Sequence, residues 1–370
     1  MKQRILVAMS GGVDSAVAAK LLLSVGNEVE SVYVRTWEHE DDLLGDCPGA
    51  KDLRDAEKVS EKLNIKFDVV NFIDFYQQEV VRPMVNGYAM GITPNPDILC
   101  NQQMKFGELM KYAQKRGFDA LATGHYCIQK INNQNGAELW EGADKNKDQS
   151  YFLARLSKEQ LAYARFPVGK FQKPDIRKMA HESNLAVANK KDSQGICFLG
   201  KVKVPDFLSH FIKNKPGDIV DKFGKVLGTH QGLHRYTLGQ RKGIGVPSNT
   251  DHEKFVVTGK DESENQLIVA FDRPEEPTLW SKTYGLRDVC FIVSEFENLH
   301  EITLLGKARY RDPSTPIKLL RDKHQEWIVE FQTPQRALTP GQVLAFYNGE
   351  QLVGSGIYSH SNLGRSALST

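Results

Sequence analysis

The sequence predicts an α/β protein in which a doubly wound parallel sheet is followed by a small β-rich domain and a C-terminal β-barrel. Three observations support this. Apolar runs alternate with amphipathic helical stretches up to about residue 204. From about residue 205 short strands punctuated by Gly and Pro replace them. A proline break at Arg273-Pro-Glu-Glu-Pro then separates two groups of strands. The expected domains are therefore 1–204, 205–274 and 275–370.

The first domain opens with the apolar run Ile5-Leu-Val-Ala-Met9, which indicates a buried parallel strand, followed by a helix from about residue 16. A ligand is expected beyond the carboxyl ends of the parallel strands. Further strands are predicted at 29–35, 66–71 and 120–123, helices at 50–63, up to about Met84 and at 97–115, and a hairpin at 126–142.

The second half is predicted to be mostly strands. One helix over 205–212 precedes them. The middle domain is predicted to hold strands 218–221, 226–229, 255–259 and 266–271, and the barrel strands near 302–310, 316–321, 326–331, 342–348 and 352–358.

Composition sets limits on the class of protein. Charged residues are 25% of the chain, hydrophobic residues 40%, and no apolar run has membrane-spanning length. The first strand begins almost at the first residue, so we expect a cytoplasmic protein without a signal peptide. A net charge of +2 does not by itself indicate nucleic acid. None of the five cysteines forms a C-x-x-C pair, so no zinc or iron–sulfur site is predicted. Cys47, Cys127 and Cys290 are expected to be small core residues.

The strongest motif is Ser10-Gly11-Gly12-Val13-Asp14-Ser15, on the predicted turn from strand to helix. Backbone N–H groups at a helix start bind anions, and glycines allow a phosphate to approach closely. Asp14 would repel a phosphate unless a metal ion or a substrate hydroxyl lies between them, so it favours Mg²⁺-nucleotide chemistry. Neither the Walker loop nor Gly-x-Gly-x-x-Gly follows this strand. The motif resembles the pyrophosphate loop of ATP pyrophosphatases. The alternative is a glycine-rich turn in which Asp14 caps the helix.

Two further stretches each carry a cysteine. In Asn95-Pro-Asp-Ile-Leu-Cys-Asn101, Pro96 fits the first helical position, so Asp97 and Cys100 would share a helix face in the first turn. That position favours a thiolate, whereas a neighbouring carboxylate opposes it. A core cysteine with a capping aspartate fits the spacing equally well. In Asp192-Ser-Gln-Gly-Ile-Cys197 the thiol follows a polar turn next to two lysines, as reactive thiols do.

Together the three stretches resemble the bacterial and mitochondrial tRNA-specific 2-thiouridylases, which belong to the ATP-pyrophosphatase superfamily. The resemblance covers essentially the whole chain. It includes Thr123-Gly-His-Tyr, Lys147-Asp-Gln-Ser and Ala308-Arg-Tyr-Arg. It implies an ATP-pyrophosphatase domain over 1–204, a central domain, and a tRNA-binding barrel. The implied activity is ATP- and Mg²⁺-dependent 2-thiolation of the wobble uridine by adenylation of the 2-oxygen and transfer of persulfide sulfur.

The resemblance also implies roles for individual residues. Cys197 would carry the persulfide from a sulfur-relay protein or a cysteine desulfurase. Cys100 would either release hydrogen sulfide by forming a disulfide with Cys197 or attack the base itself, and Asp97 would be the general acid/base. ATP contacts are expected from Ala8, Met9, Ser10, Gly11, Gly12, Val13, Asp14, Ser15, Val34 and Gly124, and tRNA contacts from Asn95, Pro96, Asp97, Lys147, Asp148, Gln149, Arg309, Tyr310 and Arg311. The enzyme is expected to act as a monomer.

Two other functions compete with this one. The first is another ATP-dependent tRNA modifier, of the 4-thiouridine or lysidine synthase type. The absence of C-x-x-C and the set Asp97, Cys100 and Cys197 count against it. The second is a non-catalytic adenine-nucleotide sensor, which would need neither Asp14 nor the β-rich half of the chain.

Overall fold

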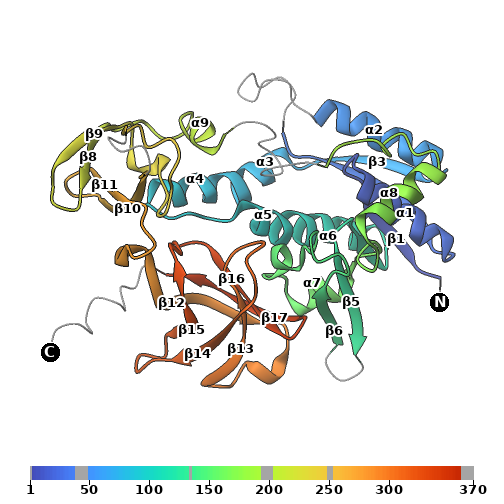
Figure 1. Cartoon of the computed structure of the whole chain (residues 1–370). Coiled ribbons are helices and arrows are strands. Elements are labelled where there is room, and N and C mark those ends of the chain that lie inside the picture. Colours follow the sequence, from blue (N-terminus) through green and yellow to red (C-terminus); the bar gives the residue numbers. More distant parts are fainter. Residues whose placement is uncertain (1, 38–48, 133–135, 193–202, 248–252, 360–370) are drawn as a thin grey trace.

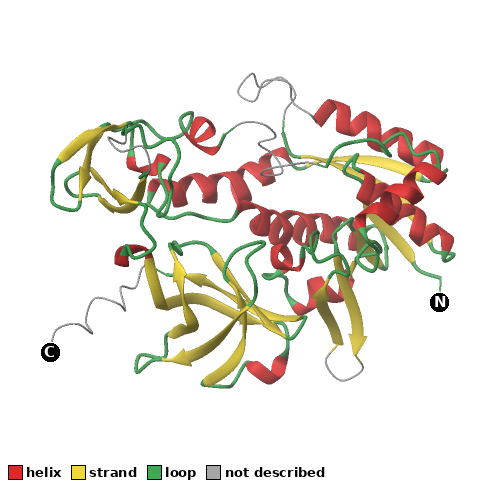
Figure 2. Ribbon diagram, in the orientation of Figure 1, coloured by secondary structure: helices red, strands yellow, loops and turns green. Residues whose placement is uncertain are grey.

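The computed structural model describes residues 2–37, 49–132, 136–192, 203–247 and 253–359. The chain forms an α/β domain, a small middle domain and a C-terminal barrel, which confirms the predicted fold class (Figure 1). Helices gather in the α/β domain, whereas strands dominate the other two (Figure 2). Within the described residues no helix combines the length and apolarity that crossing a membrane requires.

The first domain is built on a five-stranded sheet in the order β3-β2-β1-β4-β7, and every pairing in it is parallel. The central strands are short apolar runs, and Ile5, Leu6 and Val7 are almost fully buried. The strands are β1 (Arg4–Ala8), β2 (Glu28–Arg35), β3 (Lys66–Asn71), β4 (Ala120–Ala122) and β7 (Ala164–Arg165). The principal helices are α1 (Val13–Ser24), α2 (Gly49–Lys62), α7 (Lys158–Tyr163) and α8 (Lys173–Glu182).

Two helical segments lead from the sheet towards the rest of the molecule. The first consists of α3 (Ile73–Tyr76), the π-helical turn η2 (Gln77–Val81) and α4 (Arg82–Ala89). The second consists of α5 (Pro96–Leu99), the π-helical stretch η3 (Cys100–Leu109) and α6 (Met110–Lys115). Figure 1 shows α4 extending from the α/β domain to the middle domain. The sequence predicted both segments as ordinary helices, because π-helical bonding leaves no clear mark in the apolar spacing.

The middle domain follows α9 (Val204–Leu208) and contains a four-stranded sheet in the order β10-β11-β8-β9. Its core is small and includes Ile219, Val257 and Leu267. The four predicted strands are present as β8 (Gly217–Asp221), β9 (Val226–His230), β10 (Phe255–Asp261) and β11 (Gln266–Phe271).

Six strands form the C-terminal barrel, in the order β12-β15-β14-β13-β16-β17, and a pairing between β12 and β17 closes it. No strand was predicted at β12 (Trp280–Phe291), although this is the strand that closes the barrel. Two register shifts interrupt it, between Ser281 and Thr283 and between Arg287 and Cys290, so its side-chain alternation is broken. The other strands are β13 (Glu301–Lys307), β14 (Thr315–Arg321), β15 (Trp327–Arg336), β16 (Val343–Asn348) and β17 (Gln351–Tyr358).

The predicted hairpin of the first domain, β5 (Cys127–Asn132) and β6 (Gly136–Glu141), continues the sheet of the barrel. Leu139 of β6 pairs with Leu352 of β17. Lys307 of β13 forms ion pairs with Glu141 at 2.9 Å and with Asp148 at 3.3 Å. The α/β domain and the barrel are thus joined by backbone pairing and by ion pairs among half-buried and buried side chains.

Candidate active site

The motif Ser10–Ser15 forms the loop between β1 and α1, as the sequence predicted. Gly12 is the N-cap of α1, and no side chain caps that end, so Asp14 lies in the first helical turn and is not the cap. The Ser15 hydroxyl donates to the Gly12 carbonyl at 3.1 Å and accepts from the Ser10 backbone N–H at 3.2 Å. The helix start therefore presents uncapped N–H groups within a loop held by its own serines.

Glycine is required at one position in this loop, Gly11, and at one position that packs against it, Gly124. Gly11 has a φ of +71°, and a Cβ there would lie 2.2 Å from the backbone oxygen of Asp52. A Cβ on Gly124, just after β4, would lie 2.7 Å from the Ser15 nitrogen. Gly124, predicted at the nucleotide site, thus lies against the backbone of the loop itself.

Asp14 has two partners distant in sequence. The Lys173 ammonium lies 2.7 Å and 2.8 Å from the two carboxylate oxygens. The Tyr126 hydroxyl donates to Oδ1 at 2.7 Å. Burial raises the pKa of Tyr126 and the neighbouring Asp14 raises it further, so this hydroxyl stays protonated and remains a donor.

Asp192, the last residue described before 193–202, collects three cations. Lys147 lies 2.6 Å from its carboxylate, Arg177 2.6 Å and Lys173 3.0 Å. Burial by itself would raise the pKa of Asp192, but hydrogen bonds from Lys147 and Lys173 lower it to about 2. A chain of alternating charges therefore runs from Asp14 through Lys173 and Asp192 to Lys147.

The segment predicted to meet the target base begins as expected. Asn95 is the N-cap of α5, and its side chain accepts from the Ile98 backbone N–H at 3.2 Å. Pro96 occupies the first turn. Asp97 is half-buried, and Cys100 is 2% exposed at the junction of α5 with the π-helical stretch. Irregular π-helical turns are frequent at functional sites.

A loop of the barrel fixes the residues that precede Asn95. The Thr93 backbone N–H donates to the Pro340 carbonyl at 2.9 Å, and the Gln342 side-chain amide donates to the Thr93 carbonyl at 2.7 Å. Gly341, with a φ of +91°, leaves room for Ile92. The residues that precede Asn95 are thus fixed by a loop more than 240 positions later in the chain.

Cys100 packs in a cluster that links the sheet to the chain beyond residue 203. Its neighbours include Trp37, which follows β2, and Phe207 of α9, whose rings are 6.1 Å apart. Val34, expected near ATP, also contacts this cluster. Cys197 lies outside the described residues. Before residues 193–202, Asp192 pairs with Lys173 next to the nucleotide loop. After them, Phe207 packs in the same cluster as Cys100.

The other expected nucleotide residues form the base of the loop. Met9 and Val13 are buried, and the Met9 backbone N–H donates to the Val32 carbonyl at 2.8 Å. Ala8 is half-buried at the end of β1. Among the cysteines expected in the core, Cys127 is fully buried, Cys290 is half-buried and 3.2 Å from Arg155, and Cys47 lies outside the described residues.

The three residues expected along the tRNA at 147–149 differ in exposure. Asp148 is buried and accepts from the Gly142 and Ser150 backbone N–H groups. Gln149 accepts from the Tyr126 N–H at 3.0 Å. Lys147 is half-buried and is the cation of the three.

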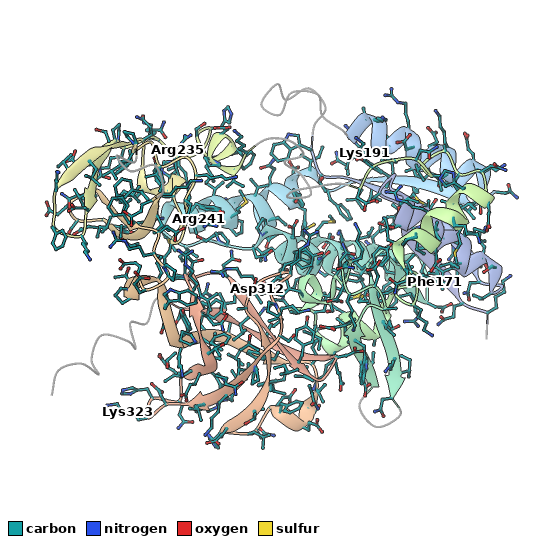
Figure 3. All side chains as sticks on the ribbon, in the orientation of Figure 1. Phe171, Lys191, Arg235, Arg241, Asp312 and Lys323 are labelled. Carbon is teal, nitrogen blue, oxygen red and sulfur yellow. The ribbon has the colours of Figure 1, made fainter. Side chains whose placement is uncertain are left out.

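The stretch Arg309–Arg311 divides in the same way. Arg309 donates to the carbonyls of Arg336 and Ala337. Tyr310 packs on Phe152 with 4.3 Å between ring centroids. Arg311 is exposed. Figure 3 places the next residue, Asp312, at the end of the barrel that faces the helices of the α/β domain, with Arg241 on the neighbouring middle domain.

The sequence did not predict site roles for Tyr126, Lys173 and Lys190. Lys173 was recognised only as part of a helix start, and its distance of 159 positions from Asp14 hides the contact. A lysine that opens a helix yet is 7% exposed needs an anionic partner, but burial cannot be seen in one sequence.

Known proteins match the chain in three consecutive regions. Residues 3–201 match the family described as "tRNA methyl transferase HUP domain". Residues 205–271 match its "PRC-barrel domain", and residues 283–358 match the "Aminomethyltransferase beta-barrel domain".

Curated relatives are similar over almost the whole length. A protein of Akkermansia muciniphila named tRNA-specific 2-thiouridylase MnmA is 43% identical over 96% of this chain and 98% of its own. Proteins of the same name from Hydrogenovibrio crunogenus and Acinetobacter baylyi are 41% and 40% identical, over 96% and 98% of this chain and 93% and 98% of their own.

Proposed function

The chain belongs to the family of tRNA-specific 2-thiouridylases, and we propose that it thiolates the wobble uridine of tRNA anticodons with ATP and a persulfide. It is a tRNA sulfurtransferase that makes 2-thiouridine and uses ATP. The observation that carries the mechanism is the serine-braced loop Ser10–Ser15 with a carboxylate in its first helical turn.

In the proposed first step the uracil 2-oxygen attacks the α-phosphate of ATP, the bond to the β-phosphate breaks, and pyrophosphate leaves. The uncapped N–H groups of α1 and the exposed hydroxyl of Ser10 hold the leaving group, while the buried Ser15 hydroxyl braces the loop from within. We propose that Asp14 acts through Mg²⁺. One carboxylate beside a phosphate cradle fits this ion, which is usually held by one or two carboxylates together with substrate phosphates. Its charge would stabilise the negative charge that develops on the phosphates.

In the proposed second step sulfur replaces the adenylated oxygen at carbon 2, and AMP leaves. We propose Cys197 as the persulfide carrier, Cys100 as the second thiol and Asp97 as the general acid/base. Cys100 either attacks the inner sulfur of the persulfide, which releases hydrogen sulfide and forms a disulfide with Cys197, or attacks the base. Asp192 pairs with Lys173 beside the nucleotide loop, and Phe207 packs in the cluster that contains Cys100. Cys197 lies between Asp192 and Phe207 in the sequence, and this supports the proposal that Cys197 and Cys100 act together.

For the nucleic acid, we propose contacts from Asn95, Pro96 and Asp97 near the base, from Lys147–Gln149 along the tRNA, and from Arg309–Arg311 on the barrel. Arg311 is the exposed cation of this set, and Lys147 is half-buried and pairs with Asp192. The other members have partners within the fold, namely Asp148, Gln149, Arg309 and Tyr310. An anticodon base is already unpaired, so moving it into a pocket costs little.

We also propose that the chain divides at 1–204, 205–274 and 275–370. The matched regions 3–201, 205–271 and 283–358 support this division. A sulfur-relay protein or a cysteine desulfurase is the proposed donor. We propose further that the enzyme acts as a monomer in the cytoplasm, where its tRNA substrate is available.

The decisive experiment incubates unmodified tRNA with the protein, ATP, Mg²⁺ and a persulfide source, and then analyses nucleosides by mass spectrometry. We expect 2-thiouridine to appear only when all components are present. 4-Thiouridine in its place, or no ATP requirement, would contradict the proposal.

A further inference from the structure

Lys173 occupies an unusual position for a lysine. It is the first residue of α8 and is 7% exposed. Its ammonium bridges both oxygens of Asp14, at 2.7 Å and 2.8 Å, and one oxygen of Asp192, at 3.0 Å. A lysine is almost never buried to this degree unless it is paired, so the site is built around this charge.

The backbone and the surroundings of Lys173 are fixed as well. Its N–H donates to the Asp144 carboxylate at 3.0 Å, and Pro174 follows it in the first helical turn. Arg177, one turn along α8, shares the Asp192 carboxylate at 2.6 Å. The ammonium is therefore delivered to the nucleotide loop by a rigid helix start and not by a flexible surface chain.

The pairing has a consequence for ligand binding. The Asp14 carboxylate takes three hydrogen bonds, two from Lys173 and one from Tyr126, so three of its roughly four acceptor positions are in use. A divalent cation on Asp14 would lie beside the Lys173 ammonium, and the repulsion between the two positive charges favours a move of Lys173 away from Asp14. Lys173 keeps its pair with Asp192 when it leaves Asp14, and a phosphate chain held at the start of α1 offers a second anion in place of the Asp14 carboxylate.

We propose that Lys173 is a pyrophosphate-binding residue of the nucleotide site. It neutralises Asp14 in the ligand-free protein and pairs with the phosphate oxygens when the nucleotide or its pyrophosphate product is bound. Asp192 is a positioning residue that keeps Lys173 within reach of the loop, together with Lys147 and Arg177. The inference rests on the proposed ATP chemistry and adds to it that Lys173 exchanges Asp14 for the phosphate oxygens when the nucleotide binds. Only ion pairs change in this step; no covalent bond forms or breaks.

The test uses inorganic pyrophosphate and isothermal titration calorimetry on the full chain, without tRNA and without Mg²⁺. Lys173→Met should bind pyrophosphate at least tenfold more weakly than the wild type. The matched control is Lys178→Met on the same helix, whose ammonium is exposed and 3.9 Å from Glu182; its affinity should stay within about twofold. Equal affinities of wild type and Lys173→Met would overturn the inference.

Removing one member of a partly buried ion pair can also unfold the protein, so a second comparison is needed. Asp14→Asn should bind metal-free pyrophosphate at least as tightly as the wild type, because a repelling carboxylate is lost and Lys173 is released. The double variant Asp14→Asn with Lys173→Met leaves no unpaired charge between these two positions, and it should bind at least tenfold more weakly than Asp14→Asn. Equal affinities of these two variants would also overturn the inference.

The outcomes separate this inference from the proposed function. If the wild type makes 2-thiouridine and binds pyrophosphate but the lysine variants bind equally well, only the role of Lys173 fails. If the wild type neither binds nor releases pyrophosphate, the proposed ATP chemistry of the loop fails first.

Discussion

The ammonium of Lys190 donates to the backbone oxygen of Gly11 at 2.8 Å, so Lys190, near the end of the first domain, supports the nucleotide loop. The same ammonium pairs with Asp52 at 2.6 Å and Asp55 at 2.5 Å, both on α2. Burial alone would lower the pKa of Lys190, but these two carboxylates raise it above its ordinary value. Lys190 therefore stays charged and ties the loop to α2.

The first prediction follows from this contact. Lys190→Met should leave Asp52 and Asp55 facing each other without their cation and should release the Gly11 carbonyl. We expect the KM for ATP to rise about tenfold or more in tRNA-dependent pyrophosphate release, with a smaller change in kcat. Lys191→Met, an exposed neighbour, is the control and should behave like the wild type. An unchanged KM in Lys190→Met would show that the loop does not need this support.

A second prediction concerns adenylation. Asp14→Ala should abolish tRNA-dependent pyrophosphate release, since the carboxylate proposed to act through Mg²⁺ is lost. The fold should survive, because Lys173 keeps its pair with Asp192. Circular dichroism verifies the fold and a coupled pyrophosphate assay measures the release. Release at the wild-type rate would mean that the loop has been misinterpreted.

A third prediction separates the two thiols. Cys197→Ser should lose both persulfide labelling and 2-thiouridine formation, because it lacks the proposed carrier. Cys100→Ser should accept the persulfide but fail to complete the transfer. Both variants should still release some pyrophosphate, since the loop is unchanged. Mass spectrometry of labelled peptides locates the persulfide, and finding it on Cys47, Cys127 or Cys290 would refute the assignment.

A fourth prediction concerns the barrel. Replacing all of Arg309–Arg311 would also damage packing, because Arg309 and Tyr310 are bonded within the fold. Arg311→Gln alone should weaken tRNA binding and reduce the slope of log affinity against log salt by about 1, as expected for one lost phosphate contact. Filter binding across a salt series measures this slope. Arg321→Gln, on the barrel strand β14, is the control, and an unaltered slope in Arg311→Gln would place the phosphate contact elsewhere.

The fifth prediction is a pH dependence of stability. The pKa of Asp192 is lowered from 3.8 to about 2 in the folded chain, so its ion pairs stabilise the fold fully above pH 4. That contribution is lost as the pH falls from about 4 to 2 and the carboxylate takes up a proton. Asp192→Asn should therefore be less stable than the wild type at pH 7, and the difference should shrink towards pH 2. Urea unfolding at pH 7, 4 and 2.5 measures this difference, and a constant difference would contradict it.

The sequence predicted four of the five strands of the parallel sheet, because each contains enough apolar or β-branched residues to be recognised locally, but it missed the two-residue strand β7 (Ala164–Arg165). The strand Lys66–Asn71 has the predicted bounds. The barrel was predicted less completely. Strand β12 (Trp280–Phe291) escaped recognition, since two register shifts break the alternation that marks a strand.

The site shows the same division between local and distant information. The loop Ser10–Ser15 is contiguous, so its position on the turn between strand and helix could be predicted and is confirmed. The partners of Asp14 could not be predicted, because Tyr126 and Lys173 come from other elements of the fold. The contacts of Thr93 with the loop at Pro340–Gln342 are equally hidden, since they depend on how the barrel docks.

The shared sheet of hairpin and barrel limits how the molecule can be divided. If the chain were cut near residue 275, strand β6 would lose its partner β17, and the Leu139 side chain, fully buried in the intact chain, would lose part of its cover. Lys307 would also be absent, leaving Glu141 and Asp148 without that cation. A bare strand edge beside apolar side chains is a template for self-association. The fragment that ends near residue 275 should therefore aggregate, although it contains the complete nucleotide loop, because the barrel no longer covers this strand edge.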